Sequence, residues 1–258
     1  MVIALVVFAP TISDFVRPSD ETGYYSTSIG ETRMIAFADG SSVTLNTNSI
    51  LEQGFSGKQR IVRLMSGEAI FDVAHDKSRP FLVYAADGVI RAVGTRFAVR
   101  VEPDNVSVTV TEGRVEMQRR PADEDVYTMI AKSESQSFSD EKGEPRATAV
   151  LVQRGEAGEI SRIEGASKQP VTERDVAERL SWTNGQLIFY DKELQSVIEE
   201  VARYTPARIM IEDEALKKRK ITGIIQIGDV SVMLDTIEQS LGVKAEEIAP
   251  NLIYLNAG

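Results

Sequence analysis

Residues 34–45, with the sequence MIAFADGSSVTL, contain two short strand-like runs on either side of Asp39-Gly40. An Asp-Gly pair between two such runs is typical of a two-residue type I′ hairpin turn, in which both central residues adopt a positive φ. The stretch therefore predicts that residues 34–37 and residues 43–45 pair as antiparallel strands.

Glycine-centred turns recur along the chain in similar settings, at Ser66-Gly67, Asp87-Gly88, Glu112-Gly113 and Arg154-Gly155. Glycine favours such turns because it adopts positive φ without a steric penalty. No helical periodicity interrupts the short strands between residues 30 and 118, so this half is predicted to be mainly β. A sandwich of short strands and a solenoid-like fold both fit the spacing.

The sequence between residues 119 and 168 is more polar, and we interpret it as long loops around one or two strands. A linker is predicted near residues 164–171. Beyond it the pattern changes, because residues 185–191 form a strand-like run and a helical apolar face follows. That face consists of Leu194, Val197, Ile198, Val201 and Ala202, and residues 207–211 form the next strand.

The same arrangement repeats 36 residues later, with Val230, Met233, Leu234 and Ile237 in place of Leu194, Val197, Ile198 and Val201. Residues 221–227 are the expected entering strand, and residues 252–255 the last strand. Asp229 is the expected N-cap and Gly242 the C-terminal stop. Residues 180–257 are thus predicted to be a small α+β domain of two β-α-β units, with the helices on one face of a sheet.

The composition argues against several classes of site. The chain of 258 residues has a net charge of −10 that is spread over both halves, which does not fit a nucleic-acid-binding surface. There is no cysteine and one histidine, His75, which is predicted to lie in a surface turn. The acidic pairs Asp123/Asp125 and Glu199-Glu200 are interpreted as solvated charges. We therefore predict no enzymatic activity, no catalytic residue, no cofactor and no metal.

The N-terminal residues 1–9, MVIALVVFA, form a nearly pure aliphatic run that is too short to span a bilayer. They fit the outer half of a transmembrane helix or a buried strand. We favour the first interpretation and expect residues 1–16 to be a partial membrane-spanning segment, with residues from Tyr24 onward on the far side of the membrane.

Five blocks of sequence, in order and spacing, resemble the FecR domain. They are Gly30-Glu31 with residues 39–46 (DGSSVTLN), residues 64–74 (LMSGEAIFDVA), residues 79–81 (RPF), residues 93–97 (VGTRF) and residues 108–115 (VTVTEGRV). Residues 180–187 (LSWTNGQL), with Leu194 and Arg203-Tyr204 downstream, look like the C-terminal region of the same family. That region is similar to the short N-terminal domains of secretins and TonB-dependent transducers.

The resemblance implies a periplasmic sensor and signal-relay protein, with residues 24–165 as the FecR-type domain. It implies a single-pass inner-membrane protein whose bulk is periplasmic. The implied partner is the N-terminal signalling domain of an outer-membrane TonB-dependent transducer, often loaded with an iron chelate. An extracytoplasmic-function sigma factor would be reached only through a cytoplasmic anti-sigma segment, which these 258 residues do not contain.

The partner-binding residues are predicted on the outward side of the first helix of the α+β domain, namely Lys192, Gln195, Glu199 and Arg203. A sheet edge beside residues 221–227 or residues 207–211 is the expected strand-binding site. Gly94 is predicted to allow a bend or a close backbone approach, with Phe97 and Val99 in the core. An envelope polysaccharide-binding protein and a structural assembly protein remain as alternative functions.

Overall fold

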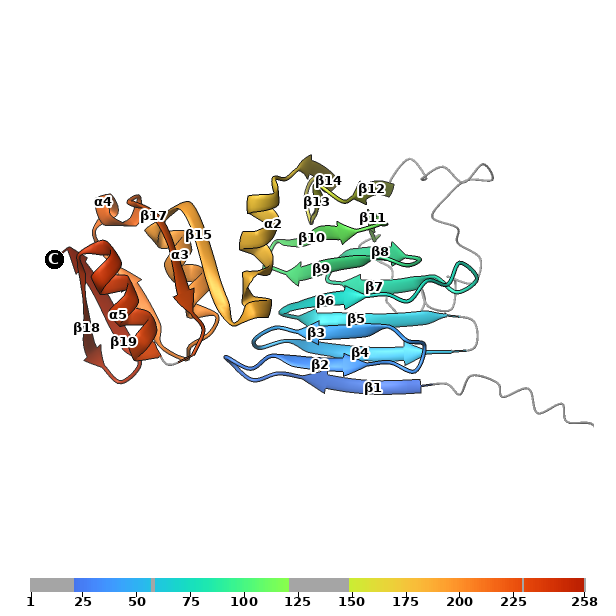
Figure 1. The fold of residues 1–258 in the computed structure, drawn as a ribbon, viewed down its shortest axis with the longest axis horizontal. Coiled ribbons are helices and arrows are strands. Elements are labelled where there is room, and N and C mark those ends of the chain that lie inside the picture. The colour runs from blue at the N-terminus through green and yellow to red at the C-terminus, as the bar shows by residue number, and fades with distance from the viewer. Residues whose placement is uncertain (1–20, 57–58, 121–148, 229, 258) are drawn as a thin grey trace, which may run out of the picture.

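The computed structural model describes residues 21–56, 59–120, 149–228 and 230–257 (Figure 1). Two seven-stranded sheets form the N-terminal part. The first sheet has the order β1 (Glu21–Ser26), β4 (Ile50–Phe55), β5 (Arg60–Ser66), β7 (Phe81–Ala85), β8 (Gly88–Ala92), β11 (Arg114–Arg119) and β12 (Ala149–Gln153). The second has the order β14 (Gly165–Pro170), β13 (Glu156–Ser161), β10 (Asn105–Glu112), β9 (Arg96–Val101), β6 (Glu68–Asp72), β3 (Ser42–Leu45) and β2 (Arg33–Ala36).

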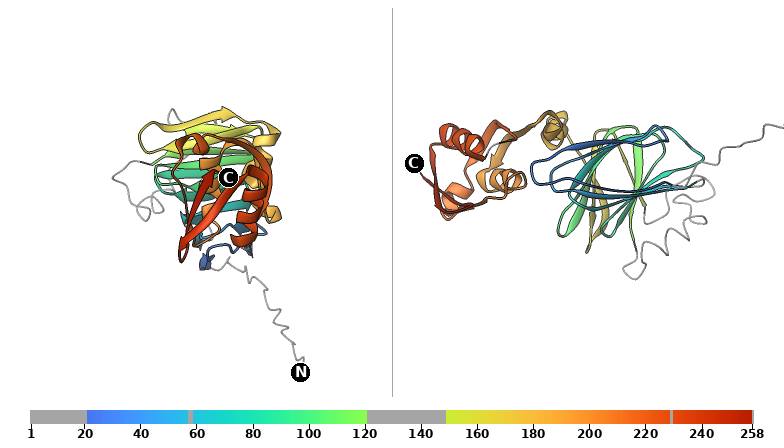
Figure 2. Two further views of the ribbon diagram at one scale, coloured as in Figure 1. Left: turned by 90° about the vertical axis from the view of Figure 1, so that its left-hand side faces the viewer. Right: turned by 90° about the horizontal axis from the view of Figure 1, so that it is seen from below.

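The two sheets pack face to face around one apolar core, so this part of the chain is a sandwich. Alternate residues point inward, as the pleat of a strand requires. Fully buried side chains come from both sheets, including Leu64, Phe81 and Ile90 from the first and Phe71 and Phe97 from the second. The chain nevertheless progresses steadily along the sandwich and changes sheets every one or two strands (Figures 1 and 2). This regular progression explains why the spacing of strands and turns in the sequence was also compatible with a solenoid-like fold.

The predicted hairpin is present, because β2 and β3 pair with Ile35 opposite Val43. The predicted turn type was wrong. Gly40 has a φ of 85°, but Asp39 does not adopt a positive φ, and the turn spans three residues between Phe37 and Ser41. The Asp39 carboxylate accepts hydrogen bonds from the backbone N–H and the hydroxyl of Ser41, which stabilises this geometry instead.

The turns at one end of the sandwich contact one another and form a continuous surface, which we call the turn stack. It comprises residues 38–41, 72–79, 93–96, 111–114 and 153–155. Backbone hydrogen bonds join Val73 to Thr95, Asp76 to Val93 and Arg154 to Gly113. Gly94 lies so close to His75 that a Cβ atom would be 2.4 Å from its Nδ1, which confirms the predicted close approach.

A buried ion pair inside the sandwich stabilises the turn stack. Arg60 is 1% exposed, and its guanidinium lies 2.8 Å from the Asp39 carboxylate. The same guanidinium donates to the carbonyl oxygens of Ala74 and Arg79. Burial opposes ionisation of Asp39, but hydrogen bonds from Ser41 and Arg60 outweigh it and keep the pKa of Asp39 below its ordinary value. One buried cation therefore fixes two segments of the turn stack.

The C-terminal part, which we call the α+β region, begins with α2 (Glu173–Leu180) and the 3₁₀ helix η1 (Ser181–Asn184). It continues with β15 (Gln186–Glu193), α3 (Leu194–Ala202), β16 (Arg208–Ile211), α4 (Glu214–Lys217), β17 (Lys220–Gln226), α5 (Val230–Leu241), β18 (Val243–Ala249) and β19 (Leu252–Ala257). It lies at the end of the sandwich opposite the start of β1 (Figure 1). The last turn of the turn stack, residues 153–155, is close to the start of α2, because the Val171 N–H donates to the Gly155 carbonyl oxygen.

Both predicted β-α-β units are present, but their strands do not form one sheet. β15 pairs with β17 in a two-stranded sheet, whereas β16, β19 and β18 form a separate three-stranded sheet. The first strand of each unit therefore belongs to a different sheet from its last strand. Gly242 follows α5 with a φ of 57°, as expected for a C-terminal stop, while Asp229 lies outside the described residues.

Several elements of the C-terminal half were not predicted from the sequence, among them β14, α2, η1, α4 and β18. Residues 165–170, interpreted as a linker, form the edge strand β14, and the short helix α2 follows them directly. The predicted membrane segment, residues 1–16, lies outside the described residues. Within the described ranges, no helix is long and apolar enough to span a membrane.

Candidate functional site

A buried carboxylate, Glu68, lies at the contact between the sandwich and the α+β region. It is the first residue of β6 and follows Gly67, whose φ of 82° turns the chain from the first sheet into the second. Ser49 accepts a hydrogen bond from the Glu68 backbone N–H and donates one to its carbonyl oxygen. A Cβ atom on Gly67 would lie 2.2 Å from Ser49 Oγ, so this turn requires glycine. The side chain of Glu68 is thereby held toward the α+β region.

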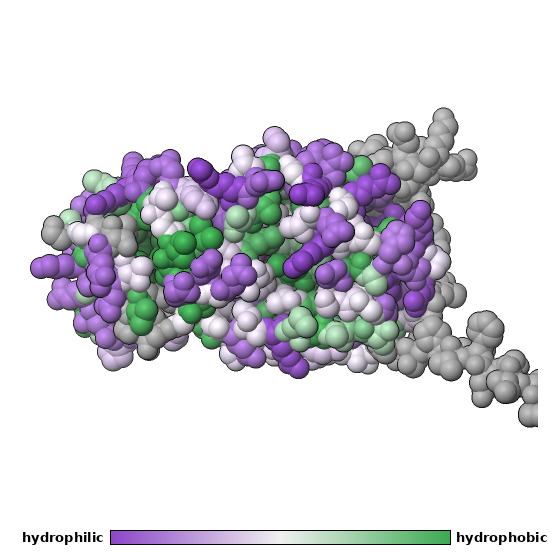
Figure 3. All heavy atoms as spheres, viewed as in Figure 1, coloured by the Kyte–Doolittle hydropathy of each residue, from purple (hydrophilic) through white to green (hydrophobic). Residues whose placement is uncertain are grey.

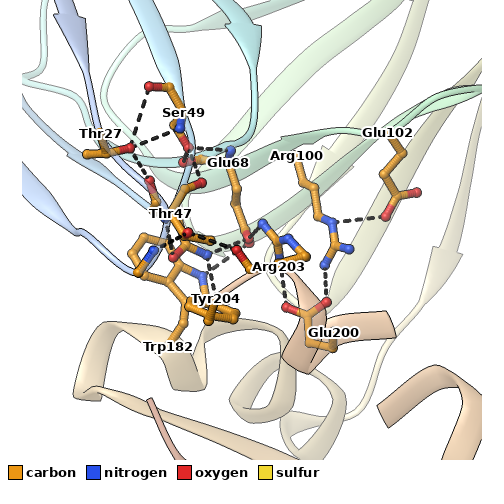
Figure 4. A network of polar contacts seen from close by, with 12 residues as sticks. Thr27, Thr47, Ser49, Glu68, Arg100, Glu102, Trp182, Glu200, Arg203 and Tyr204 are labelled. Carbon is orange, nitrogen blue, oxygen red and sulfur yellow. Dashed lines mark hydrogen bonds and ion pairs between the residues drawn. The ribbon is translucent and has the colours of Figure 1, made fainter. Parts of the chain in front are cut away.

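Three side chains donate hydrogen bonds to Glu68 (Figure 4). The Trp182 indole donates to Oε1 at 3.1 Å, and Arg203 donates to Oε2 at 2.9 Å. Asn46 also donates to Oε2 at 2.9 Å. Glu68 is only 5% exposed, so it has little contact with water. The three donors therefore compensate for the burial of its carboxylate.

Arg203 connects this carboxylate to a longer series of charges. Its guanidinium also contacts Glu200, and the other oxygen of Glu200 accepts from Arg100 of β9 at 2.8 Å. Arg100 in turn pairs with Glu102. Burial opposes the charge on Arg203, but the carboxylates of Glu200 and Glu68 outweigh it and hold the pKa of Arg203 above its ordinary value. Acidic and basic side chains therefore alternate across the junction between the two parts.

The residues around Arg203 add neutral polar contacts. Burial raises the pKa of Tyr204 well above its ordinary value, and its hydroxyl accepts a hydrogen bond from Asn46 at 2.8 Å. The Thr47 hydroxyl donates to the Arg203 carbonyl oxygen at 3.0 Å and accepts from the Gly30 N–H. The end of α3 is thus bonded to the β3–β4 turn of the sandwich (Figure 4).

Apolar packing surrounds these polar contacts. Ile70 and Ala98 lie on the outer face of the second sheet and belong to the same buried cluster as Trp182, Leu194 and Val201 of the α+β region. The core of the α+β region is therefore completed by the sandwich. Such shared burial favours one fixed orientation of the two parts over independent motion.

A cleft of about 480 Å³ lies beside this contact. Its floor is the outer face of the second sheet, where Ser107, Thr109 and Ala157 are too small to fill it. The opposite wall is formed by α2 and β15, with Asp175, Glu178, Arg179 and Lys192 among its residues. Burial raises the pKa of Glu178, an effect that its 3.1 Å ion pair with Lys192 offsets only in part.

The four predicted partner-binding residues do not share one free surface. Gln195 and Glu199 do lie together on the outer side of α3, joined by a hydrogen bond of 2.8 Å. Lys192 belongs to β15 and pairs with Glu178. Arg203 was predicted to face outward, and this was wrong, because its side chain is 19% exposed and binds Glu68 of the sandwich. A helical wheel could not show that a second domain covers that side.

Three further predictions are confirmed, namely those for His75, for the core residues Phe97 and Val99, and for the two edge strands. His75 is exposed in the turn stack, and Phe97 and Val99 are fully buried. Both strands proposed as binding edges, β16 and β17, are at the edges of their sheets. In the part of the chain that the structure describes, no group of three or more acidic or histidine side chains could hold a metal ion.

The residues that bind Glu68 were not predicted as a site. Glu68 and Trp182 were noted only as parts of two sequence blocks that are 114 residues apart. The available signal was a carboxylate placed at the start of a strand whose other residues are all apolar until Asp72. A buried acid of this kind requires a partner, although the sequence does not identify it.

Comparison with known proteins supports the two-part description. Family models match residues 23–116 as "FecR protein" and residues 186–255 as "FecR, C-terminal". Two crystal structures of a "putative anti-sigma factor" from Parabacteroides distasonis resemble the chain, each with a TM-score of 0.66 and 20% sequence identity. The matches cover 92% of this chain and 100% and 99% of those chains. At that identity the likeness establishes the fold alone, and no curated protein matches the chain.

Proposed function

Because the chain belongs to the FecR family of regulators, we propose that it is the periplasmic sensor and signal-relay part of such a protein. In this proposal the α+β region receives a signal from the N-terminal signalling domain of an outer-membrane TonB-dependent transducer. An extracytoplasmic-function sigma factor is reached through a cytoplasmic segment of the regulator. The role is one of binding and relay, without catalysis.

The observation that carries this proposal is the bonded contact between the two parts. A relay needs a mechanical connection between the receiving surface and the end that transmits, and the Glu68, Arg203 and Glu200 contacts supply one. The chain enters β1 at the turn-stack end, as the pairing of Glu21 with Phe55 shows, whereas the α+β region lies at the opposite end. This layout suits a protein anchored in the inner membrane through its N-terminal segment.

The receiving surface is proposed at the edge of the two-stranded sheet of the α+β region. The exposed apolar side chain of Ile224 on β17 is 53% accessible, and Figure 3 shows an apolar area over β15 and β17. A strand from a partner could bind such an edge through backbone hydrogen bonds. Gln195 and Glu199 on the outer side of α3 remain candidates for polar contacts with the partner.

The test is titration of the full chain with the signalling domain of its cognate transducer. Ile224→Lys should weaken binding about tenfold or more, because a charge would replace an apolar contact at the centre of the interface. Met34→Lys is the matched control, since Met34 is 74% exposed on β2, an edge strand of the sandwich. If only Met34→Lys weakens binding, the receiving surface lies on the sandwich, and if the wild-type chain does not bind, the proposed partner is wrong.

Polysaccharide binding receives less support from the site. Saccharide sites use exposed aromatic faces, and Trp182, the single tryptophan, is 2% exposed. The cleft beside it is lined instead by charged and small polar side chains.

A further inference from the structure

The exposed charges of the turn stack are predominantly positive. Lys77, Arg96, Arg114 and Arg154 are all exposed, and none of them forms an ion pair with another described residue. The same surface has two exposed acids, Asp72 and Glu112. They lie on the strands that flank β9, each directly opposite Arg96. Basic side chains therefore outnumber acidic ones among the free charges.

The remaining acids of the turn stack are bound internally. Asp39 is paired with buried Arg60 at 2.8 Å. Asp76 accepts hydrogen bonds from the hydroxyl and N–H of Ser78 and from Arg79, and these keep the pKa of Asp76 far below its ordinary value. Both carboxylates thus shape the turns and contribute little to attraction or repulsion of a partner.

The rest of the molecule has the opposite charge. The whole chain carries a net charge of −10, and residues 172–257 contain 15 acidic and 10 basic side chains. Most of the turn stack lies toward the end of the sandwich at which β1 begins, away from the acidic α+β region. Only its last turn approaches α2, where the Val171 N–H donates to the Gly155 carbonyl oxygen. An anionic surface would therefore attract one end of the molecule and repel the other.

The chain enters the sandwich at this positive end. β1 begins at Glu21 opposite Phe55, and the next turn leads into Arg60 beneath the turn stack. An anchor that precedes β1 would consequently be close to the turn stack and far from Arg203. If that segment is membrane-anchored, the turn stack is the surface nearest to the lipid headgroups.

We propose that the turn stack rests on the anionic phospholipid headgroups of the membrane that anchors the chain, which orients the α+β region away from the bilayer. The proposal rests on the N-terminal anchoring in the proposed function. Basic residues close to an anionic leaflet are attracted over about one Debye length. A few such charges suffice here, because tethering makes the contact intramolecular.

The absence of cysteine allows a direct test with single introduced thiols. Ser78→Cys in the turn stack and Gln239→Cys on the exposed side of α5 would each carry a fluorophore in the full chain. The labelled proteins are reconstituted in vesicles of phosphatidylcholine alone or of equal parts phosphatidylcholine and phosphatidylglycerol. Both vesicles contain a small amount of lipid with a spin-labelled headgroup, which quenches nearby fluorophores.

We expect quenching at position 78 to be at least about threefold stronger on the anionic vesicles and to decrease at high salt, with no quenching at position 239. Replacing Arg96, Arg114 and Arg154 together by Glu should abolish it. The matched control replaces Lys218, Arg219 and Lys244, three exposed cations of the α+β region, by Glu and should leave it unchanged. Unchanged Trp182 emission verifies that both variants are folded.

The possible failures are distinguishable. Equal quenching on both vesicles, quenching that survives the triple turn-stack substitution, or none at position 78 on vesicles that carry the protein would overturn the lipid contact alone. If the full chain associates with neither kind of vesicle, the anchoring assumed in the proposed function is wrong and the lipid contact is wrong with it.

Discussion

At the scale of single residues, Glu68 determines how the two parts are joined. Its carboxylate accepts hydrogen bonds from Trp182, Asn46 and Arg203. Because the side chain is buried, water could not take the place of these three donors. Breaking a buried pair is costly because the remaining charge stays buried without compensation. Glu102, which pairs only at the surface with Arg100, provides the natural comparison.

We predict that Glu68→Gln lowers the free energy of unfolding by about 3 kcal/mol, the low end for a buried pair because Arg203 is 19% exposed. Glu102→Gln should change it by less than about 0.5 kcal/mol. Urea denaturation followed by Trp182 emission measures both. Equal losses in the two variants would mean that Glu68 stabilises the protein no more than a surface charge does.

Asp39 should give the sandwich a dependence on acidic pH. Its pKa is lowered in the folded protein, so it stabilises the fold above its unfolded pKa of about 4, and this contribution is lost as the pH falls through the folded value. Asp39→Asn should therefore destabilise the protein strongly at pH 7, with a difference from wild type that shrinks below about pH 4. Urea unfolding at several pH values tests this, and a constant difference would contradict it.

At the scale of elements, α2 is a helix held by few contacts. Its capping box between Thr172 and Asp175 is complete, yet none of its residues is buried. It is attached to β15 through the Glu178–Lys192 pair and through Arg174, whose guanidinium lies 4.8 Å from the centre of the Tyr190 ring. Local openings are expected to begin here, beside the cleft.

We predict that α2 becomes better protected as the pH falls from 7 toward 4. The pKa of Glu178 is raised by burial, so its contribution to stability is greatest below its unfolded pKa and is lost as the pH rises through the folded value. Asp175, whose pKa is lowered, keeps the cap ionised over this range. Hydrogen exchange of α2 amides, corrected for intrinsic rates, is the measurement. Glu178→Gln should remove the pH dependence and Glu173→Gln, on the exposed first turn, should not.

The elements also show what sequence patterns can and cannot predict. The β2–β3 hairpin and α3 were predictable because their apolar residues follow the period of a strand or a helix. β14 was missed because its sequence, GASKQP, has no such period, and its place at a sheet edge needs none. The site was missed for a different reason. Its members come from turns and strand ends far apart in the chain, and only the folded arrangement shows that Arg203 faces Glu68.

At the scale of the whole molecule, the α+β region is not an independent body attached by a linker. Ile70 and Ala98 of the second sheet belong to its apolar cluster, and Glu68 binds its only tryptophan. The helix face of α3 can still bury Leu194, Val197 and Val201 within the region itself. The isolated region should therefore fold, but with an incomplete surface.

We predict that a fragment of residues 172–258 retains its helices while Trp182 becomes accessible. Its emission should shift to longer wavelength, and acrylamide should quench it several-fold more strongly than in the full chain, because the sandwich no longer covers the indole. Circular dichroism verifies the helices. An emission maximum identical to that of the full chain would show that the region buries Trp182 without the sandwich.

The alternation of the chain between the two sheets has a consequence for the order of folding. Every strand of the sandwich pairs with one no more than three strands away in sequence, whereas the Asn46–Tyr204 bond joins residues 158 positions apart. Short loop closures are rapid and distant ones slow, so the sandwich can assemble layer by layer before the contact around Glu68 closes. In a stopped-flow refolding experiment, far-UV circular dichroism should therefore recover before Trp182 fluorescence. A nascent chain would complete the sandwich first and form its fixed contact with the α+β region only at the final step.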